Sequence, residues 1–422
     1  MALDATTAVL VRHRPLDDAF EAHRALAKLD DRDRAFAFNL ATTVLRRLGQ
    51  IDDLIDRCLA HPLSERLAPV RALLRIGLAQ LAFSRTPPHA AVDTTVALAR
   101  RGAARPHAAL INAVLRRLST EGTQWLAQQD APCLNTPDWL WQSWASCYGE
   151  GTARAIATMH LAEPPLDLTP RSADEGERLA SALGAVRLPT GTLRLSHAGP
   201  VTALPGFDDG DWWVQDAAAA LPARLLGEVA GQCVLDLCAA PGGKTAQFAA
   251  AGADVTAVDR SPKRITRLAG NLRRLGLAAE LVTADVASWR PAEPVSLVLL
   301  DAPCSATGTI RRHPDVARLK SEAEVGELAA VQRRLLLASI EMLAPGGLLV
   351  YCACSLQPSE GEDLIDSLIA EGAPITRLPI RPDEIGGCAE VLTSLGDLRT
   401  LPCHLTEFGG LDGFYAARLR RR

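Results

Sequence analysis

The stretch Leu237-Cys238-Ala239-Ala240-Pro241-Gly242-Gly243-Lys244-Thr245 decides the fold of this 422-residue chain. It starts where the apolar run Cys233–Leu237 ends, and a helical segment, Thr245–Ala251, follows it. A buried strand, a turn with little side-chain bulk and a helix N-terminus form the first unit of an α/β sheet. Such sheets bind ligands beyond the carboxyl ends of their strands. The stretch therefore predicts a cofactor loop at that edge.

Strands and helices alternate from Trp213 onward, which is typical of a doubly wound parallel sheet. The predicted strands are Cys233–Leu237, Val255–Asp259, Glu280–Thr283, Ser296–Leu300 and Leu348–Tyr351. The predicted helices are Thr245–Ala251, Lys263–Leu275 and Glu327–Met342. Two further segments, near Val391–Thr393 and at Phe414–Leu419, are predicted to close the sheet with antiparallel strands.

The glycine turn matches neither common phosphate-binding motif. A P-loop needs a glycine where this chain has Cys238, and the dinucleotide motif fails because Gly242 and Gly243 are adjacent. What remains is a helix N-terminus at Thr245, whose unpaired N–H groups suit a carboxylate such as that of a methionine moiety. We therefore expect a methyl-donor site rather than a phosphate site.

Two acids extend this expected site along the sheet edge. Asp259 ends the next strand, where acids of related folds accept hydrogen bonds from ribose hydroxyls. Asp285 follows the strand after that and is placed to reach an adenine amine. Any one of these features alone is usually an ordinary turn or loop residue. Their occurrence at three successive strand ends favours a cofactor site.

Two cysteines also follow predicted strands, Cys304 in Asp301-Ala302-Pro303-Cys304 and Cys354 in Ala353-Cys354-Ser355. A free cysteine is most often a small buried apolar residue, but two of them beside a cofactor loop suit covalent catalysis. A thiolate that adds to carbon 6 of cytosine makes carbon 5 able to attack a methyl group, and a base must then remove the carbon-5 proton. Asp301 is placed to stabilise that adduct at ring nitrogen 3, as a buried acid.

The other cysteines indicate a reducing compartment. The chain has 10 cysteines in scattered positions and no C-x-x-C pair, so we expect free thiols, no metal site and a cytoplasmic protein. Cys352 is predicted to face inward. No apolar run reaches the roughly 20 residues of a membrane helix, and Met1-Ala2-Leu3-Asp4 does not begin a signal peptide.

The N-terminal part has helical periodicity from about Ala19 to Leu118. The apolar positions form two stripes, Leu40, Val44, Leu45, Leu48 and Leu67, Val70, Leu73, Leu74, Leu78. We expect an all-helical domain over residues 1–130. Short strand candidates near Leu166–Leu168 and Thr192–Leu195 predict a small α+β linker domain over 131–205, which leaves 206–422 for the α/β catalytic domain.

The motifs at both ends resemble known families. Arg32-Asp33-Arg34-Ala35-Phe36, the segment Leu73–Leu81 and the segment Asn112–Leu118 resemble the RNA-binding antitermination factor NusB. The glycine stretch, the two cysteine motifs and Asp412-Gly413-Phe414-Tyr415 resemble the RNA (cytosine-5)-methyltransferases. Together they make the chain similar to the bacterial members that modify 16S ribosomal RNA. The resemblance implies a Rossmann-like S-adenosylmethionine-dependent methyltransferase domain behind a NusB-like domain.

The resemblance also implies a role for each site residue. Cys354 is the nucleophile that attacks carbon 6, and Cys304 releases the enzyme from the methylated product. The implied cofactor contacts are Cys238, Ala239, Ala240, Pro241, Gly242, Gly243, Lys244, Asp259, Asp285 and Asp301, with Asp301 shared between cofactor and base. The segment Ile310–Asp315 is expected to adjoin the active site. The family's usual threonine before the nucleophile is Ala353 here, so a hydroxyl contact from that position is absent.

Three functions remain open on the sequence. The first is methylation of cytosine carbon 5 in 16S ribosomal RNA, with naked RNA or an early assembly state as the partner, no membrane, and a monomeric enzyme. The second is methylation of transfer RNA, which the NusB-like front disfavours. The third is an RNA-binding assembly factor without activity, which the intact cysteines disfavour. The net charge of −4 argues against tight non-specific RNA binding but leaves a locally basic groove open.

Overall fold

The protein is described here from a computed structural model covering residues 1–84, 86–172, 174–196 and 199–422. The chain forms two compact units, and each contains two stretches of sequence. The helical unit consists of Met1–Ala162 and Ile310–Lys320. The sheet unit consists of Glu163–Thr309 and Ser321–Arg422.

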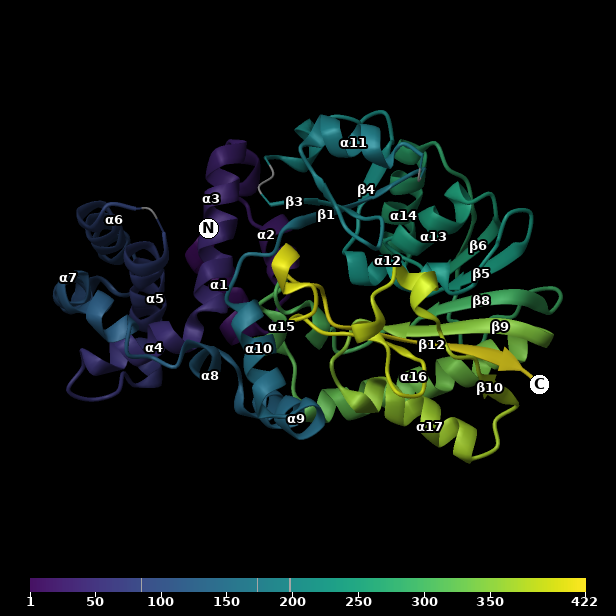
Figure 1. Ribbon diagram of the computed structural model, residues 1–422. Helices are drawn as coiled ribbons and strands as arrows, with labels where there is room; N and C mark the ends of the chain where they lie inside the picture. The colour runs from purple at the N-terminus through teal and green to yellow at the C-terminus, as the bar shows by residue number, and fades with distance from the viewer. Residues whose placement is uncertain (85, 173, 197–198) are drawn as a thin grey trace. The chain divides into compact units, whose positions relative to one another are not determined.

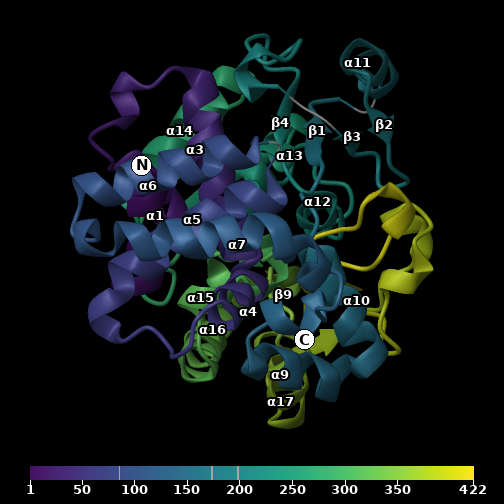
Figure 2. The ribbon, with the colours of Figure 1, turned by 90° about the vertical axis from the view of Figure 1, so that its left-hand side faces the viewer.

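The helical unit contains eleven α-helices among its described residues. They are α1 (Ala2–Arg12), α2 (Leu16–Glu21), α3 (Asp31–Arg46), α4 (Leu48–Arg57), α5 (Ala68–Phe83), α6 (Pro88–Arg101), α7 (Ala108–Leu126), α8 (Ala131–Asn135), α9 (Asp138–Tyr148), α10 (Glu150–His160) and α15 (Val316–Leu319). Helices α5 and α7 lie side by side (Figure 2). The predicted helical front is confirmed, and it starts earlier than expected because α1 lies before Ala19.

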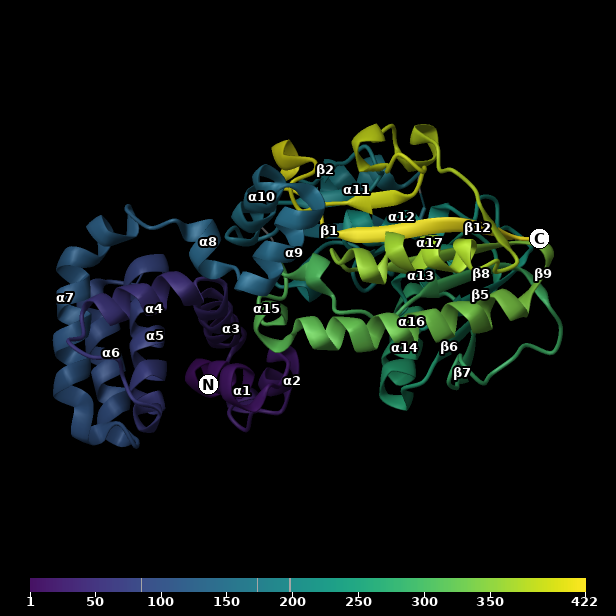
Figure 3. The same ribbon diagram turned by 90° about the horizontal axis from the view of Figure 1, so that it is seen from below.

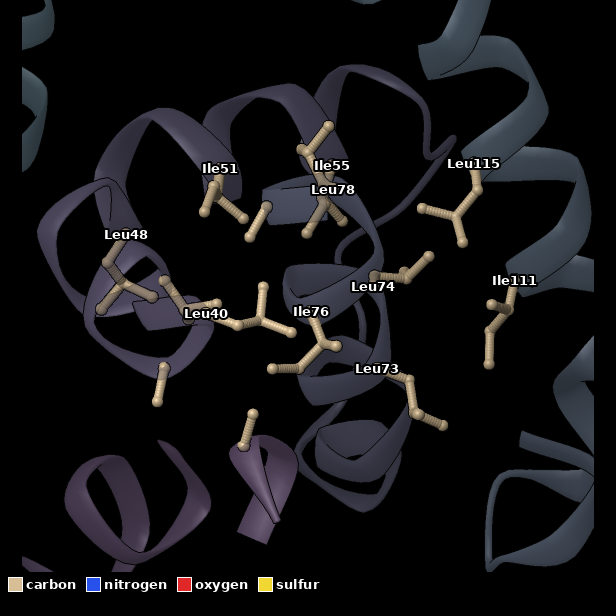
Figure 4. Packing of buried hydrophobic residues seen from close by; sticks show 14 of the residues in the cluster. Leu40, Leu48, Ile51, Ile55, Leu73, Leu74, Ile76, Leu78, Ile111 and Leu115 are labelled. Atoms are coloured by element: carbon tan, nitrogen blue, oxygen red, sulfur yellow. The ribbon is translucent and has the colours of Figure 1, made fainter. Parts of the chain in front are cut away.

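Both predicted apolar stripes point into the core of the helical unit. Leu40 and Leu48 of the first stripe pack near Leu73, Leu74 and Leu78 of the second (Figure 4). Because α5 and α7 approach closely, position 77 is a glycine: a Cβ atom there would lie 2.7 Å from the Leu115 side chain. The periodicity thus places these helices against one another through a continuous apolar interface.

The structure divides the middle of the chain differently from the three predicted ranges. Helices α8 to α10 fall inside the predicted linker domain over 131–205 but belong to the helical unit. The rest of that range belongs to the sheet unit, and so does the predicted catalytic range except Ile310–Lys320. The three ranges stay a prediction of domain boundaries.

A small antiparallel sheet opens the sheet unit. Its order is β2-β3-β1-β4, from β1 (Leu166–Pro170), β2 (Val186–Arg187), β3 (Leu193–Leu195) and β4 (Trp212–Val214). Helix α11 (Gly176–Leu183) connects β1 to β2. The two predicted strand candidates of this region are confirmed as β1 and β3.

The large sheet has the order β10-β12-β9-β8-β5-β6-β7, with β11 paired to β12. Its strands are β5 (Cys233–Leu237), β6 (Asp254–Asp259), β7 (Glu280–Thr283), β8 (Val295–Asp301), β9 (Leu343–Ala353), β10 (Ile375–Arg377), β11 (Leu398–Thr400) and β12 (Phe414–Arg421). Strands β5 to β9 pair in parallel, and β12 pairs antiparallel with β9. The predicted doubly wound sheet with an antiparallel closing strand is confirmed.

Helices cover both faces of this sheet (Figures 1 and 3). They are α12 (Ala217–Arg224), α13 (Gly243–Ala250), α14 (Pro262–Leu275), α16 (Glu322–Met342) and α17 (Glu362–Ala370). Alternate residues of β8 enter different cores: Leu297 and Leu299 pack with α12, whereas Val298 and Leu300 pack with α16 and α17. Near-continuous apolar strands are therefore buried on both sides, as parallel sheets require.

Several predicted bounds differ from the structure. The helix predicted to start at Thr245 starts at Gly243 as α13, and two further differences concern the last strands. The segment Val391–Thr393 is not a strand, because residues Ala389–Val391 form a 3₁₀ turn; β11 lies further on and makes the expected antiparallel pair. Strand β9 is longer than predicted and continues to Ala353, so no turn separates Cys352 from the ladder. Among the described residues, no helix is both long and apolar enough to cross a membrane.

Candidate active site

Five parallel strands end at one edge of the large sheet and carry the predicted site residues there. The register aligns Leu237 of β5 with Leu300 of β8 and with Val258 of β6. Asp301 in turn pairs with Cys352 of β9. The glycine loop, the two acids and the two cysteines therefore emerge from neighbouring strand ends, as the sequence predicts.

The glycine loop turns sharply from β5 into α13. Gly242 is the N-cap residue with a φ of 103°, and a Cβ atom there would lie 2.8 Å from the Leu268 side chain. No side chain caps this helix end, so the N–H groups of its first turn have no partner within the helix. The helix end thus suits the carboxylate of a methionine moiety.

A buried acid, Asp236, lies beneath the loop. One of its carboxylate oxygens accepts a hydrogen bond from the Thr245 hydroxyl at 2.5 Å, and the other has no partner among the described residues. Burial raises the pKa of Asp236 to about 7, partly opposed by the Thr245 hydrogen bond and by the charge of Lys244. Asp236 was not predicted as a site residue, although it directly precedes the stretch Leu237–Thr245.

Asp259 is almost fully buried and already has several protein partners. It accepts hydrogen bonds from the backbone N–H groups of Ala240 at 3.2 Å and Ser261 at 2.9 Å. The Arg264 guanidinium makes an ion pair with it at 3.1 Å. Its carboxylate therefore fixes the loop against β6, and a ribose hydroxyl there would share oxygens with these donors.

Asp285 and Cys238 differ in exposure. Asp285 follows the end of β7 and is exposed to solvent. Its carboxylate accepts a hydrogen bond from the backbone N–H of Ala287 at 2.9 Å. Cys238 is half-buried, and burial raises the pKa of its thiol to about 12. Cys238 is therefore a neutral thiol in the loop wall.

Lys244 and Asp301 form an ion pair at the centre of the edge, with 2.8 Å between Nζ and the carboxylate. Burial alone would lower the pKa of Lys244, but the charge and hydrogen bond of Asp301 raise it above its ordinary value. The ammonium also lies 4.9 Å from the centre of the Phe414 ring. Cys352 is buried beside them, as predicted, with its sulfur 3.6 Å from Asp301. Asp301 thus acts here as a hydrogen-bond acceptor.

The side chains of the two predicted catalytic cysteines, Cys304 and Cys354, are in contact. Their sulfur atoms lie 3.4 Å apart, although the residues are separated by a long stretch of chain. Both are free thiols. The hydrogen bond to Cys354 and then burial raise the pKa of Cys304 well above its ordinary value. Cys304 therefore keeps its proton, and its thiol can donate a hydrogen bond to the Cys354 sulfur.

Close backbone packing holds the Cys304 loop in place. The N–H of Gly308 donates to the carbonyl oxygen of Cys354 at 3.1 Å, and the N–H of Gly413 donates to the carbonyl of Gly308 at 2.8 Å. A Cβ atom at Gly308 would lie 1.9 Å from the Gly413 oxygen. The Asp412-Gly413-Phe414 motif thus supports the loop that follows Cys304.

Sequence reasoning missed a polar cluster around Glu360. Ser305, Gln332, Ser355 and Glu360 are fully or almost fully buried and bond to one another. Two of them directly follow the predicted cysteines, which was a signal available in the sequence. Among the described residues, no group of three or more His, Cys, Asp or Glu is arranged to hold a metal ion.

Comparison with family models gives two matches that together span most of the chain. Residues 223–420 match the family described as "16S rRNA methyltransferase RsmB/F". Residues 1–120 match the NusB family.

Relatives match over most of the chain. A protein of Pseudomonas putida named ribosomal RNA small subunit methyltransferase B is 38% identical over 99% of this chain and 97% of its own length. A protein of the same name from Shigella flexneri is 38% identical over 82% of this chain and 84% of its own.

Solved structures share the fold. A crystal structure of PH0851 matches with a TM-score of 0.77 at 21% identity, over 100% of this chain and 98% of that one. NSun6 from Pyrococcus horikoshii with SFG matches with a TM-score of 0.57 at 18% identity, over 68% of this chain and 98% of that one. At these identities the likeness concerns the fold alone.

Proposed function

The chain belongs to the RsmB/F family of 16S rRNA methyltransferases, and from this premise we propose that it methylates carbon 5 of a cytosine in 16S ribosomal RNA. It is an S-adenosylmethionine-dependent RNA methyltransferase with a NusB domain at its N-terminus. The proposal adds the target atom and the use of a covalent cysteine adduct. The observation that supports it best is the 3.4 Å separation of the Cys304 and Cys354 sulfur atoms beside the cofactor loop.

The proposed reaction starts at Cys354. Its thiolate, stabilised by the proton that Cys304 retains, adds to carbon 6 of the cytosine and forms a carbon–sulfur bond. Carbon 5 then carries enough electron density to form a bond to a methyl carbon. Bound S-adenosylmethionine supplies that methyl as an electrophile bonded to a positively charged sulfur. The sulfur–methyl bond breaks as the carbon–methyl bond forms.

The second half of the reaction depends on Cys304. Once Cys354 is bonded to carbon 6 and no longer raises the pKa of Cys304, the Cys304 thiol would lose its proton to solvent, and the resulting thiolate would take the carbon-5 proton. The electrons of the carbon–hydrogen bond restore the ring double bond, and the carbon 6–sulfur bond breaks to return the Cys354 thiolate. Asp301 is proposed to orient the ring near nitrogen 3.

The cofactor contacts are proposed on the same edge. The loop Cys238–Lys244 and the α13 N-terminus would hold the methionine carboxylate, with Asp259 and Asp301 further along the edge. Asp285 is exposed at the end of β7 and would hold the adenine amine. Carbon 6 is out of reach inside a stacked helix, so we also propose that the target base is turned out of its stack.

The biological setting is proposed as a cytoplasmic, monomeric enzyme. Its partner would be naked 16S RNA or an early assembly intermediate, bound in part by the NusB domain. This setting follows from the substrate named by the family and from the absence of metal-type or paired cysteine motifs in the sequence.

Incubation with tritium-labelled S-adenosylmethionine and unmodified RNA tests the substrate. Label in 5-methylcytosine of small-subunit RNA is the expected result. Label confined to transfer RNA would support the second candidate, and no label on either RNA would support a non-catalytic assembly factor. In the same assay, Cys354→Ala should reduce transfer by at least about 10⁴-fold, because the covalent route is lost. Full activity of that variant would end the assignment.

A further inference from the structure

Glu360 is a buried carboxylate that the reaction above does not use. It ends the 3₁₀ turn Pro358–Glu360, and its side chain is 0% exposed. One carboxylate oxygen accepts from the Ser305 N–H at 2.8 Å and from the Gln332 amide at 2.9 Å. The other accepts from the hydroxyls of Ser305 and Ser355.

The partners of Glu360 flank both catalytic cysteines. Ser305 directly follows Cys304, and Ser355 directly follows Cys354. The same carboxylate therefore binds the residue after each sulfur-bearing residue. Gln332 of α16 extends this link, since its amide also donates to the carbonyl oxygen of Pro303 at 3.0 Å.

The backbone around Glu360 is also fixed. Its carbonyl oxygen accepts from the Tyr351 hydroxyl at 2.8 Å, and Tyr351 lies in the strand that leads to Cys354. A carboxylate in an apolar interior is tolerated only with several donors, and here four donors occupy its two oxygens. Both the side chain and the backbone carbonyl of Glu360 are therefore held by hydrogen bonds from neighbouring residues.

We propose that Glu360 is a positioning residue that holds the Cys304 and Cys354 sulfur atoms at reacting distance. The proposal rests on the proposed function for the use of that pair, but it concerns the geometry of the free enzyme. Because all the side-chain hydrogen bonds of Glu360 among the described residues come from the two cysteine loops and from Gln332, Glu360 acts through them and not on the substrate. Loss of the carboxylate should let the two loops separate.

A short bifunctional thiol reagent, dibromobimane, measures this geometry without RNA or cofactor. In the wild type it should bridge Cys304 and Cys354, as identified by mass spectrometry of the linked peptides. Glu360→Ala should reduce the bridging rate at least about tenfold and lower kcat by a similar factor, with little change in KM for RNA. In Glu360→Gln the side chain has the same length and can still hydrogen-bond to both cysteine loops, so this variant should retain most of the bridging rate and most of kcat.

A control variant and a folding measurement accompany this test. Glu371→Ala removes an exposed carboxylate that pairs with Arg333 of α16 and should leave bridging unchanged. Thermal melting identifies any variant that is unfolded, and Glu360→Gln is then the variant that decides. Wild-type bridging in folded Glu360→Ala would overturn the proposal, and equal kcat losses in the Gln and Ala variants would indicate proton transfer instead. An active Cys354→Ala enzyme would overturn the proposed function while the bridging result still stood.

A second feature lies elsewhere on the sheet unit. A cleft of about 800 Å³ is bordered by the end of β1, by β2 and by α12, and three arginines line it: Arg171, Arg187 and Arg224. The Arg224 guanidinium lies over Gly191, where a Cβ atom would come within 3.3 Å of it. The cleft wall is therefore shaped around this side chain.

The positive charge in the cleft exceeds the negative charge. Asp174 and Glu228 also line it, but no ion pair joins them to the three arginines among the described residues. Burial in the wall, and then the like charge of Arg187, lower the pKa of Arg224. Guanidinium groups that line one cleft without a carboxylate ion-pair partner among the described residues are suited to a phosphate group.

We infer that this cleft binds the phosphate backbone of the RNA substrate. The inference rests on the proposed function for the presence of RNA. Binding of an unmodified small-subunit RNA transcript should be measured from low to high potassium chloride. The double variant Arg187→Ala/Arg224→Ala should reduce the slope of log affinity against log salt by about 1.4 to 1.8, as expected for two lost phosphate contacts.

The control removes the same charge from ion pairs outside the cleft. Arg290→Ala/Arg381→Ala breaks exposed pairs with Glu341 and Asp383 and should leave the slope unchanged. The cleft variant should raise KM for RNA and leave kcat at saturating RNA unchanged. A wild-type slope in the cleft variant would overturn the inference, whereas failure of the wild type to bind the RNA would overturn the proposed function.

Discussion

At the scale of single residues, the sulfur atoms of the two proposed catalytic cysteines are in contact but have different surroundings. Cys304 keeps its proton because the hydrogen bond to Cys354 and then burial raise its pKa, whereas Cys354 directly follows the end of β9. Their approximate placement was predictable, since each follows an apolar strand, whereas their catalytic roles stay a proposal. The support from Glu360 was not, because its partners come from three separate segments that no local pattern connects.

Asp236 gives a prediction on pH at the same scale. Its pKa is about 7 in the folded protein against 3.8 ordinarily, so the protonated acid stabilises the fold fully below about pH 4. That stabilisation is lost as the pH rises to about 7, on the order of 4 kcal/mol for three pKa units. Asp236→Asn does not titrate and should gain melting temperature relative to wild type as pH rises from 5 to 8. Melting curves of both proteins across that range check this.

The control for this prediction is Asp254→Asn, at the exposed start of β6. Its melting temperature should follow that of the wild type at every pH. A constant difference between Asp236→Asn and wild type from pH 5 to 8 would contradict the account of Asp236 as a buried acid.

At the scale of elements, the strands of the large sheet could be predicted from the sequence because they are apolar runs that end at turn residues. The predicted bounds of β5 and β7 agree with the structure, whereas β6 starts one residue earlier than predicted and β8 is one residue longer at each end. Elements with weaker sequence patterns were not predicted correctly. Strand β11 is only three residues long and was placed near Val391–Thr393, and α1 was missed although it is amphipathic. The first turn of α16 was also missed, although Ser321 and Glu324 form a capping box, which is a signal of a helix start in the sequence.

The loop after Cys304 gives a prediction at this scale. Gly308→Ala would place a methyl group against the Gly413 backbone, so the loop must move. We expect a stability loss of about 1–3 kcal/mol, as for overpacking, and at least about a tenfold loss of methyl transfer. Chemical denaturation and the transfer assay measure both effects.

Gly326→Ala is the matched control, because nothing lies within 4 Å of its Cβ position in α16. It should gain up to about 1 kcal/mol, since alanine is the better helix residue. A Gly308→Ala protein with normal stability and activity would show that the Gly308–Gly413 contact does not support the site.

At the scale of the whole molecule, the chain passes from the Cys304 loop directly into the helical unit. Segment Ile310–Lys320 belongs to that unit, where Asp315 accepts from the N–H of Leu16 at 2.9 Å and Arg46 donates to the carbonyl of Arg311 at 2.7 Å. The family resemblance indicated that this segment adjoins the active site. Its burial in the helical unit required contacts far apart in sequence and was not predictable from periodicity.

Asp315→Ala tests whether this anchoring supports catalysis. Removing the acceptor leaves the Leu16 N–H buried without a partner, which should cost about 1–3 kcal/mol. We expect faster hydrogen exchange across residues 304–320 and slower methyl transfer, with unchanged S-adenosylmethionine affinity. Asp18→Ala, on the exposed side of α2, should change neither. Unchanged exchange in the Asp315 variant would refute the anchoring.

The central claim is that Cys354 forms the bond to the RNA base and Cys304 is needed to release it. A denaturing gel of Cys304→Ala incubated with S-adenosylmethionine and unmodified 16S RNA tests this most directly. The account predicts an RNA-shifted protein band that survives denaturant and disappears in the Cys304→Ala/Cys354→Ala double variant. A band that persists without Cys354, or no band from folded Cys304→Ala, would contradict it.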